Sequence, residues 1–225
     1  HGSEGLVQVQ AKKCIFAGHS TLAARIVPQM RTQQKEAELT GVKVPMLYAK
    51  MLMKNAQAFK KLGVYSLYAP ESPYCLVQLD DPVNIGGYEA PKSPDEPIIV
   101  HAVRIATDFE GATARDKYRS GRRKLFAQQY DDLKNQLFTQ MRELYSLAGE
   151  NFDDMLVELT LNRWGHGYSY EQTTLWDSDA ATEKTTHAMQ QPIGNIFMAG
   201  SDVGWMPYLQ GAVDEAHRAV QEALA

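Results

Sequence analysis

The hydrophobic and polar positions of this chain follow two periods, which separate predicted strands from predicted helices. Apolar residues that alternate with polar ones, or form short runs bounded by turn residues, predict strands. These stretches are residues 6–10, 12–18, 44–53, 64–68, 74–79, 97–105, 155–163 and 196–199. Apolar residues at steps of three to four predict helices. These stretches are residues 22–27, 33–38, 56–62 and a helix that starts near Tyr208.

The longest periodic segment covers residues 115–147, where charged residues fill the gaps between apolar ones. Its apolar positions share the helical spacing and are Tyr118, Leu125, Phe126, Leu133, Leu137, Met141 and Leu144. The pattern predicts an amphipathic segment that is either one long helix or two helices joined at a kink.

The order of these elements predicts the fold class. In the middle of the chain, turns and loops rich in Pro, Gly and Asp, such as residues 80–95, separate the strands. Strands joined by turns rather than by helices favour a mixed or antiparallel sheet. Both ends of the chain carry pieces of an α/β arrangement. We therefore expect an α/β protein in which an α+β domain with a long helix interrupts a second, α/β domain.

The composition excludes several classes of protein. Hydrophobic residues make up 44% and charged residues 22% of the 225 positions, as in an ordinary globular protein. The 23 Lys and Arg against 27 Asp and Glu give a net charge of −4, which does not indicate a nucleic-acid-binding surface. No apolar run approaches the roughly 20 residues of a membrane helix. The polar, small-residue start at His1 does not predict a signal peptide, and we expect it to be an added or cut end rather than a native start.

Side chains suited to metal, thiol or serine chemistry are scattered. The six His residues show no metal-ligand spacing, so no metal site is expected. No Gly-x-Ser-x-Gly elbow surrounds Ser20 or Ser201. Cys14 and Cys75 lie in apolar stretches, which predicts two buried free thiols and leaves a disulfide as the alternative.

The first stretch that could carry chemistry lies near the C-terminus. The apolar run of residues 196–199 leads into Gly200-Ser201-Asp202 and then into the helix that starts near Tyr208. A turn that feeds a helix N-terminus offers free backbone N–H groups and the positive end of the helix dipole. Gly211 allows a close approach to the backbone of that helix. The stretch therefore predicts a site for phosphates or electron-rich rings.

The second such stretch is Asn-Arg-Trp-Gly-His-Gly-Tyr-Ser-Tyr-Glu, residues 162–171, immediately after a predicted strand. Its two glycines predict a tight backbone that places the flanking side chains on one cavity wall. Aromatic rings can stack on a planar cofactor or enclose an alkyl-ammonium group. An aromatic corner of the core is the alternative.

Both stretches resemble FAD-dependent amine oxidases and dehydrogenases. In that family a Phe-Ala-Gly-x-acid turn precedes a Gly-x-x-x-Gly-Ala helix, and this chain has Phe197, Ala199, Gly200 and Asp202 in the turn. Asp202 stands where the family usually has Glu, and Pro207 stands where the helix motif has its first glycine.

The resemblance is narrower for bacterial spermidine dehydrogenases and their relatives. Their Asn-Arg-Trp-x-His-Gly-Tyr-x-Tyr-Glu segment matches residues 162–171, and their Pro-Val-x-Ile-Gly-Gly-Tyr and Phe-x-Lys-Leu-Gly-Val segments match residues 82–88 and 59–64. The matches keep the same order and cover about residues 6–224.

The resemblance implies a domain plan and a set of site residues. Residues 1–28 and 161–225 correspond to the C-terminal portion of a Rossmann-like FAD-binding domain, and residues 29–160 to a substrate-binding domain. The implied flavin contacts are Gly200, Ser201, Asp202, Tyr208, Leu209 and Gly211. The implied catalytic pocket is Trp164, His166, Tyr168, Tyr170 and Glu171, with Glu171 as the carboxylate for a polyamine nitrogen. Haem is implied only because some relatives carry it, and the compartment is periplasmic, by preference, or cytoplasmic.

One departure from the family is large. The Gly-x-Gly-x-x-Gly fingerprint that holds the FAD pyrophosphate is absent from the sequence. The resemblance therefore implies the C-terminal half of a flavoenzyme that oxidises an amine, with a polyamine as the implied substrate class. It also implies an N-terminal FAD-binding half from another chain or a removed segment. The alternatives are a non-catalytic scaffold or assembly subunit, and a flavoprotein that acts on a substrate other than an amine.

Overall fold

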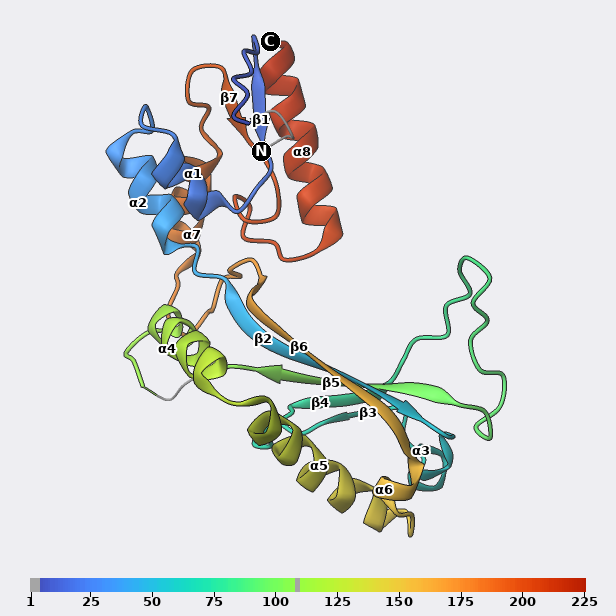
Figure 1. The fold of residues 1–225 in the computed structure, drawn as a ribbon. Coiled ribbons are helices and arrows are strands. Elements are labelled where there is room, and N and C mark those ends of the chain that lie inside the picture. The colour runs from blue at the N-terminus through green and yellow to red at the C-terminus, as the bar shows by residue number, and fades with distance from the viewer. Residues whose placement is uncertain (1–4, 108–109) are drawn as a thin grey trace. The chain divides into compact units, whose positions relative to one another are not determined.

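The computed structural model describes residues 5–107 and 110–225, which fold into two compact units (Figure 1). The terminal unit contains His1–Lys43, Thr113–Arg115 and Tyr168–Ala225, and the central unit contains Val44–Ala112 and Asp116–Gly167. Each unit combines helices and strands, so the mixed α/β class predicted from the sequence is confirmed. The units divide the chain near residues 43 and 167, whereas the functional domains 1–28, 29–160 and 161–225 stay a prediction.

A five-stranded sheet forms the central unit, in the order β3-β4-β5-β2-β6. Its strands are β2 (Val44–Met53), β3 (Ser66–Tyr68), β4 (Leu76–Leu79), β5 (Ile98–Ile105) and β6 (Leu156–Tyr168). The pairs β3/β4, β4/β5 and β2/β5 are antiparallel. The predicted sheet in the middle of the chain is therefore confirmed, although β2 pairs with β5 rather than with the next strand along the chain.

Four helices accompany this sheet: α3 (Gln57–Leu62), α4 (Ala114–Ala127), α5 (Tyr130–Leu147) and α6 (Phe152–Met155). α3 ends at Gly63, whose φ of +70° is the left-handed conformation that closes a helix and favours glycine. The long periodic segment forms two helices. Gln129 adopts an extended backbone and forms a capping box with Asp132, which ends α4 and starts α5.

The core of the central unit lies between one face of the sheet and α5. On β2, Leu47, Ala49, Met51 and Met53 are fully buried, and the alternating residues between them are half-buried. On α5, Leu133, Leu137, Met141 and Tyr145 recur at steps of four and are also buried. The buried residues of β2 and α5 pack together in one hydrophobic cluster. This cluster lies on one face of the sheet, and within the described residues it brings no helix to the second face.

The terminal unit is built around two short parallel strands. β1 (Cys14–Phe16) pairs with β7 (Ile196–Met198), with Ile15 opposite Phe197. α8 (Leu209–Leu224) lies beside them (Figure 1), and its Ala219 and Ala223 pack on Phe197. The other helices of this unit are α1 (Ser20–Ile26), α2 (Thr32–Thr40) and α7 (Asp179–Gln190).

Several sequence predictions were wrong. Residues 6–10 alternate like a strand but form none, and their side chains are exposed. β6 continues through Tyr168, so residues 162–168 belong to the strand and do not follow it. α6 and α7 were not predicted. Cys14 and Cys75 are free thiols, but Cys14 is exposed and Cys75 is half-buried rather than buried.

Residues 5–107 and 110–225 contain neither a membrane-spanning helix nor a cluster of metal ligands. No helix within them is long and apolar enough to cross a membrane. Within the same ranges, no three His, Cys, Asp or Glu side chains gather as a metal ion requires.

Candidate functional site

The turn that follows β7 is fixed to its own unit by backbone hydrogen bonds. Gly200 has a φ of +98°, a conformation that side chains rarely adopt. The Ala199 N–H donates to the Phe16 carbonyl at 2.9 Å, and the Met206 N–H donates to the Ser201 carbonyl at 3.2 Å. The predicted strand–turn–helix is therefore present, and its glycine is required by the backbone.

Asp202 is the buried anchor of this turn, with 7% of its surface exposed. One carboxylate oxygen accepts from the Ser20 N–H at 3.1 Å, with His19 Nδ1 at 3.3 Å, and the other accepts from Lys43 Nζ at 2.5 Å. Burial alone raises the pKa of a carboxyl group, but the hydrogen bonds from His19 and Lys43 outweigh it and lower the pKa of Asp202. The carboxylate ties the turn to α1 and Lys43, and its contact with a flavin stays a prediction.

A second carboxyl group is buried close to Asp202. Glu38 on α2 is fully buried, and neither of its carboxyl oxygens has a hydrogen bond of good geometry within the described residues. Burial, opposed by a polar interaction with Ser20 and reinforced by the charge of Asp202, raises the pKa of Glu38 to about 7. Two carboxyl groups therefore lie close together in this unit, Asp202 ionised and Glu38 holding its proton up to about neutral pH.

The start of α8 presents backbone donors and exposed side chains. Its N-cap residue Tyr208 makes no side-chain cap bond, and its first turn contains no acidic residue. Tyr208 and Leu209 are 52% and 80% exposed. A Cβ on Gly211 would collide with Met206, so this glycine allows the helix to pack on the turn. The free N–H groups fit an electron-rich ligand, while Gly211 has a packing role that the sequence did not reveal.

Tyr170 lies in a packed cluster of the terminal unit. Its hydroxyl donates to Asp177, the Arg115 guanidinium lies 4.1 Å above its ring, and its ring meets that of Trp205 edge-on at 4.7 Å. Burial, followed by the bond to Asp177, raises the pKa of Tyr170 to about 12. Because Trp205 ends the Asp202 turn, the structure brings Tyr170 beside that turn. Glu171, the next residue, is exposed.

Trp164, His166 and Tyr168 alternate along β6 and therefore share a strand face. All three are exposed, Trp164 by 54%. Gly165 lies between them on the opposite face, where a Cβ would collide with Phe126 of α4. This glycine admits the helix on one side of the strand and leaves the aromatic row on the other. Trp164 and His166 belong to the central unit, whereas Tyr168 begins the third segment of the terminal unit.

The same face of the central sheet carries a polar group that the sequence analysis did not identify. The strand register places His101 of β5 opposite Lys50, and its ring meets Tyr48 edge-on at 4.9 Å. Lys50 Nζ lies 2.7 Å from Asp80. Burial and the charge of Lys50 lower the pKa of His101, and its Nδ1 has no hydrogen-bond partner within the described residues.

The sequence did contain a signal for His101. Val100 and Ala102 face the core, so the strand period already places the residue between them on the second face. Arg115, Asp177 and Glu38 gave no such signal, because their positions depend on contacts between segments far apart in the chain.

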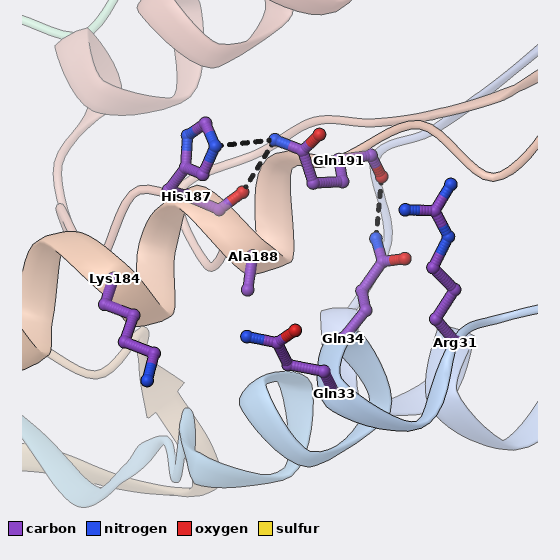
Figure 2. Close-up of a pocket in the computed structure, with 7 residues that line it drawn as sticks. All are labelled: Arg31, Gln33, Gln34, Lys184, His187, Ala188 and Gln191. Carbon is purple, nitrogen blue, oxygen red and sulfur yellow. Dashed lines mark hydrogen bonds between the residues drawn. The ribbon is translucent and has the colours of Figure 1, made fainter.

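A cavity of about 290 Å³ lies between α2 and α7 in the terminal unit (Figure 2). Its lining consists of Arg31, Gln33, Gln34, Lys184, His187, Ala188 and Gln191. The Gln34 side chain donates to the Gln191 carbonyl at 2.6 Å and closes one wall, as Figure 2 shows. None of the site residues expected from the sequence lines this cavity.

The fold of the chain matches part of several solved amine oxidases. A redesigned putrescine oxidase superposes with a TM-score of 0.65 at 14% identity, over 95% of this chain and 43% of that chain. Wild-type putrescine oxidase bound to putrescine gives 0.59 at 13% identity, over 96% and 43%. Cyclohexylamine oxidase from Brevibacterium oxydans gives 0.62 at 12% identity, over 98% and 45%.

These matches define the architecture as that of one part of an amine oxidase. The chain spans less than half the length of the enzymes that it matches. At such low identity the likeness concerns the fold alone. No protein-family profile matches the sequence, and no curated protein matches it.

Proposed function

We propose that this chain is the C-terminal half of a flavin-dependent oxidoreductase that oxidises an amine to an imine, which water hydrolyses to an aldehyde. The observation that carries the proposal is the fold match to putrescine oxidase and cyclohexylamine oxidase over at least 95% of this chain. When bound, FAD supplies the hydride acceptor. Positioning the amine and excluding water are then the tasks of the protein.

The residues present fit one side of a flavin. The uncapped start of α8, without an acidic residue in its first turn, offers backbone N–H groups to the electron-rich edge of the ring. Gly200 and Ser201 add backbone groups from the adjoining turn. The sequence contains no Gly-x-Gly-x-x-Gly turn for the pyrophosphate, so an N-terminal half-domain has to supply that part of the site.

The second face of the central sheet supports binding of the amine. The exposed indole of Trp164 and the ring of Tyr48 offer aromatic surface to a cationic or alkyl-amine group. His101, whose pKa is lowered by burial and by the charge of Lys50, adds an uncharged ring to this face. In the terminal unit, the exposed Glu171 offers a carboxylate suited to a distal ammonium of a polyamine.

The decisive measurement is made on the native species that contains this chain. We expect a flavin absorbance spectrum and reduction of that flavin by amines in a panel of monoamines, diamines and polyamines. A preference for spermidine or putrescine over monoamines supports the polyamine proposal. Reduction of the flavin only by compounds other than amines supports the alternative, a flavoprotein that acts on a non-amine substrate.

Trp164→Ala tests the aromatic wall in that species. We expect a loss of about tenfold in kcat/KM for amines, because removal of an aromatic contact with a cation costs about 1–2 kcal/mol. Trp176→Ala, which removes another exposed indole, is the matched control and should leave kcat/KM unchanged. Unchanged turnover and amine affinity in Trp164→Ala would exclude this residue from the site.

One observation favours a second candidate, a non-catalytic scaffold or assembly subunit. The sequence contains no pyrophosphate fingerprint, although 95% of this chain matches part of a solved amine oxidase. A folded, colourless native species without a flavin-binding partner would support this alternative and reject the oxidoreductase.

A further inference from the structure

The cavity between α2 and α7 differs in charge from the protein as a whole. Its described lining includes Arg31, Lys184 and His187 and contains no Asp or Glu (Figure 2). The whole chain, in contrast, has a net charge of −4. Arg31 precedes α2 and Lys184 belongs to α7, so two helices that contact each other bring these basic side chains to one place.

The two permanent cations of this cavity are not neutralised by the protein. Among residues 5–107 and 110–225, no carboxylate lies at ion-pairing distance from Arg31 or Lys184. Glu183, the neighbour of Lys184 in sequence, lines an adjoining hollow instead. Arg218 of the same unit, by comparison, binds both Glu215 and Glu222. Unpaired cations that line one cavity favour an anionic occupant.

The start of α2 adds to this preference for an anion. Its N-cap residue Arg31 makes no side-chain cap bond, and its first turn contains no acidic residue. The Lys35 N–H donates to the Arg31 carbonyl at 2.9 Å, so the N–H groups of residues 32–34 precede this first helical bond. The guanidinium fork of arginine matches the oxygens of a phosphate, and the positive end of a helix favours the same group.

The remaining lining is polar and uncharged. Gln34 is 4% exposed, and its amide nitrogen donates to the carbonyls of Met189 and Gln191. Its Oε1 accepts no hydrogen bond within the described part of the chain, and the Gln33 side chain makes none there either. A free amide oxygen in a polar cavity suits a hydroxyl group of a ligand.

The size of the cavity indicates a small molecule. Its volume of about 290 Å³ lies at the lower end of small-molecule sites, which span roughly 300–1,000 Å³. It is about ten times the roughly 30 Å³ that one water molecule occupies in the liquid. A phosphate group therefore leaves room for a short polar remainder beside the glutamine amides.

We propose that the α2–α7 cavity binds the phosphate group of a small phosphorylated molecule, with Arg31 and Lys184 as its charged partners and Gln34 Oε1 as the acceptor for a ligand hydroxyl. Inorganic phosphate shares this chemistry and is the other source of such a group. The site is separate from the residues proposed for the flavin and the amine, none of which lines the cavity.

Isothermal titration calorimetry on the native species that contains this chain tests the site at low salt. The probes are glycerol phosphate, inorganic phosphate and, as a dicarboxylate, succinate. Arg31→Gln with Lys184→Gln removes the two cavity cations. Arg25→Gln with Lys35→Gln is the matched control, because it removes the same charge from exposed positions of α1 and α2 outside the cavity. Circular dichroism melts verify that both variants keep the fold.

We expect glycerol phosphate to bind wild type, the cavity pair to weaken that binding at least tenfold, and the control pair to keep it within twofold. Inorganic phosphate that binds as tightly, with the same loss in the cavity pair, supports the phosphate site and assigns the free anion as its ligand.

Three results would overturn the proposal. Neither phosphate probe binds wild type, or both variant pairs weaken binding equally, which would indicate a general effect of surface charge. Tighter binding of succinate than of both phosphate probes would make the cavity a carboxylate site.

Discussion

At the scale of single residues, two buried carboxyl groups of opposite protonation behaviour lie close together in the terminal unit. Asp202 is ionised because His19 and Lys43 hold its oxygens. Glu38 is buried without such partners, and its pKa is raised to about 7. A second ionised carboxylate next to Asp202 would add repulsion in a desolvated place, so the unit favours protonated Glu38.

Glu38 therefore predicts a pH dependence of stability. The folded pKa of about 7 lies above the ordinary value of 4.5, so the folded state holds an extra proton between these values, and stability falls as the pH rises from 4.5 to 7. The loss is up to about 3 kcal/mol at 1.36 kcal/mol per pKa unit.

We expect Glu38→Gln to remove that loss in urea unfolding curves between pH 5 and pH 8. Glu36→Gln, at an exposed position on the same helix, should follow the wild-type curve. A Glu38→Gln protein with the same pH profile as wild type would show that Glu38 is ionised in the folded state.

At the scale of elements, glycines decide how closely α4 approaches the sheet. A Cβ on Gly121 would collide with the Ala106 carbonyl, which is backbone and has little room to move. A Cβ on Gly165 meets only the far end of the Phe126 side chain, which is 56% exposed and can rotate away. Both contacts would be too short for a Cβ, but backbone would have to move at Gly121 and a side chain at Gly165.

Gly121→Ala should therefore lower the free energy of unfolding by about 3 kcal/mol, the upper part of the range for an overpacked contact. Thermal unfolding followed by circular dichroism measures this effect, and Arg123→Ala, an exposed change on the same helix, serves as the control. Gly165→Ala should cost less than Gly121→Ala. The reverse order would contradict the assignment of Gly121 to the tighter contact.

The sequence predicted a strand or helix well where burial of a single face sets the spacing of its apolar residues. The period of two in residues 44–53 and the period near four in residues 130–147 follow from burial on a single face, and both elements formed. Residues 6–10 have the correct alternation but no neighbouring strand to bond, so pattern alone did not make a strand. β6 extended beyond residue 163 because Gly165 and Gly167 pack against α4 and β2, which the sequence does not state.

At the scale of the whole molecule, the hydrophobic clusters follow the two units. The largest cluster, from Leu47 to Phe152, draws all of its buried residues from the central unit. The core of the terminal unit joins β7 and α8 through Phe197 and Ala219, and β1 reaches that unit from the other end of the chain.

Residues 44–167 should therefore fold by themselves. We expect this segment, expressed alone, to unfold in one cooperative thermal transition and to show dispersed amide signals in NMR spectra, because its core is complete. Residues 168–225 alone lack β1, α1 and α2 and should not show such a transition. A non-cooperative melt of residues 44–167 would mean that its core depends on the terminal unit.

The sequence by itself determined the mixed α/β class, most of the strands and helices, and the strand–turn–helix at residues 196–224, because these depend on local period, capping and backbone conformation. Tertiary structure alone decided which distant side chains meet: Lys43 with Asp202, Arg115 with Tyr170 and Asp177, and His101 with Tyr48. The physical reason is that such contacts depend on where the folded backbone brings segments together, and burial then sets the pKa values of the groups that meet.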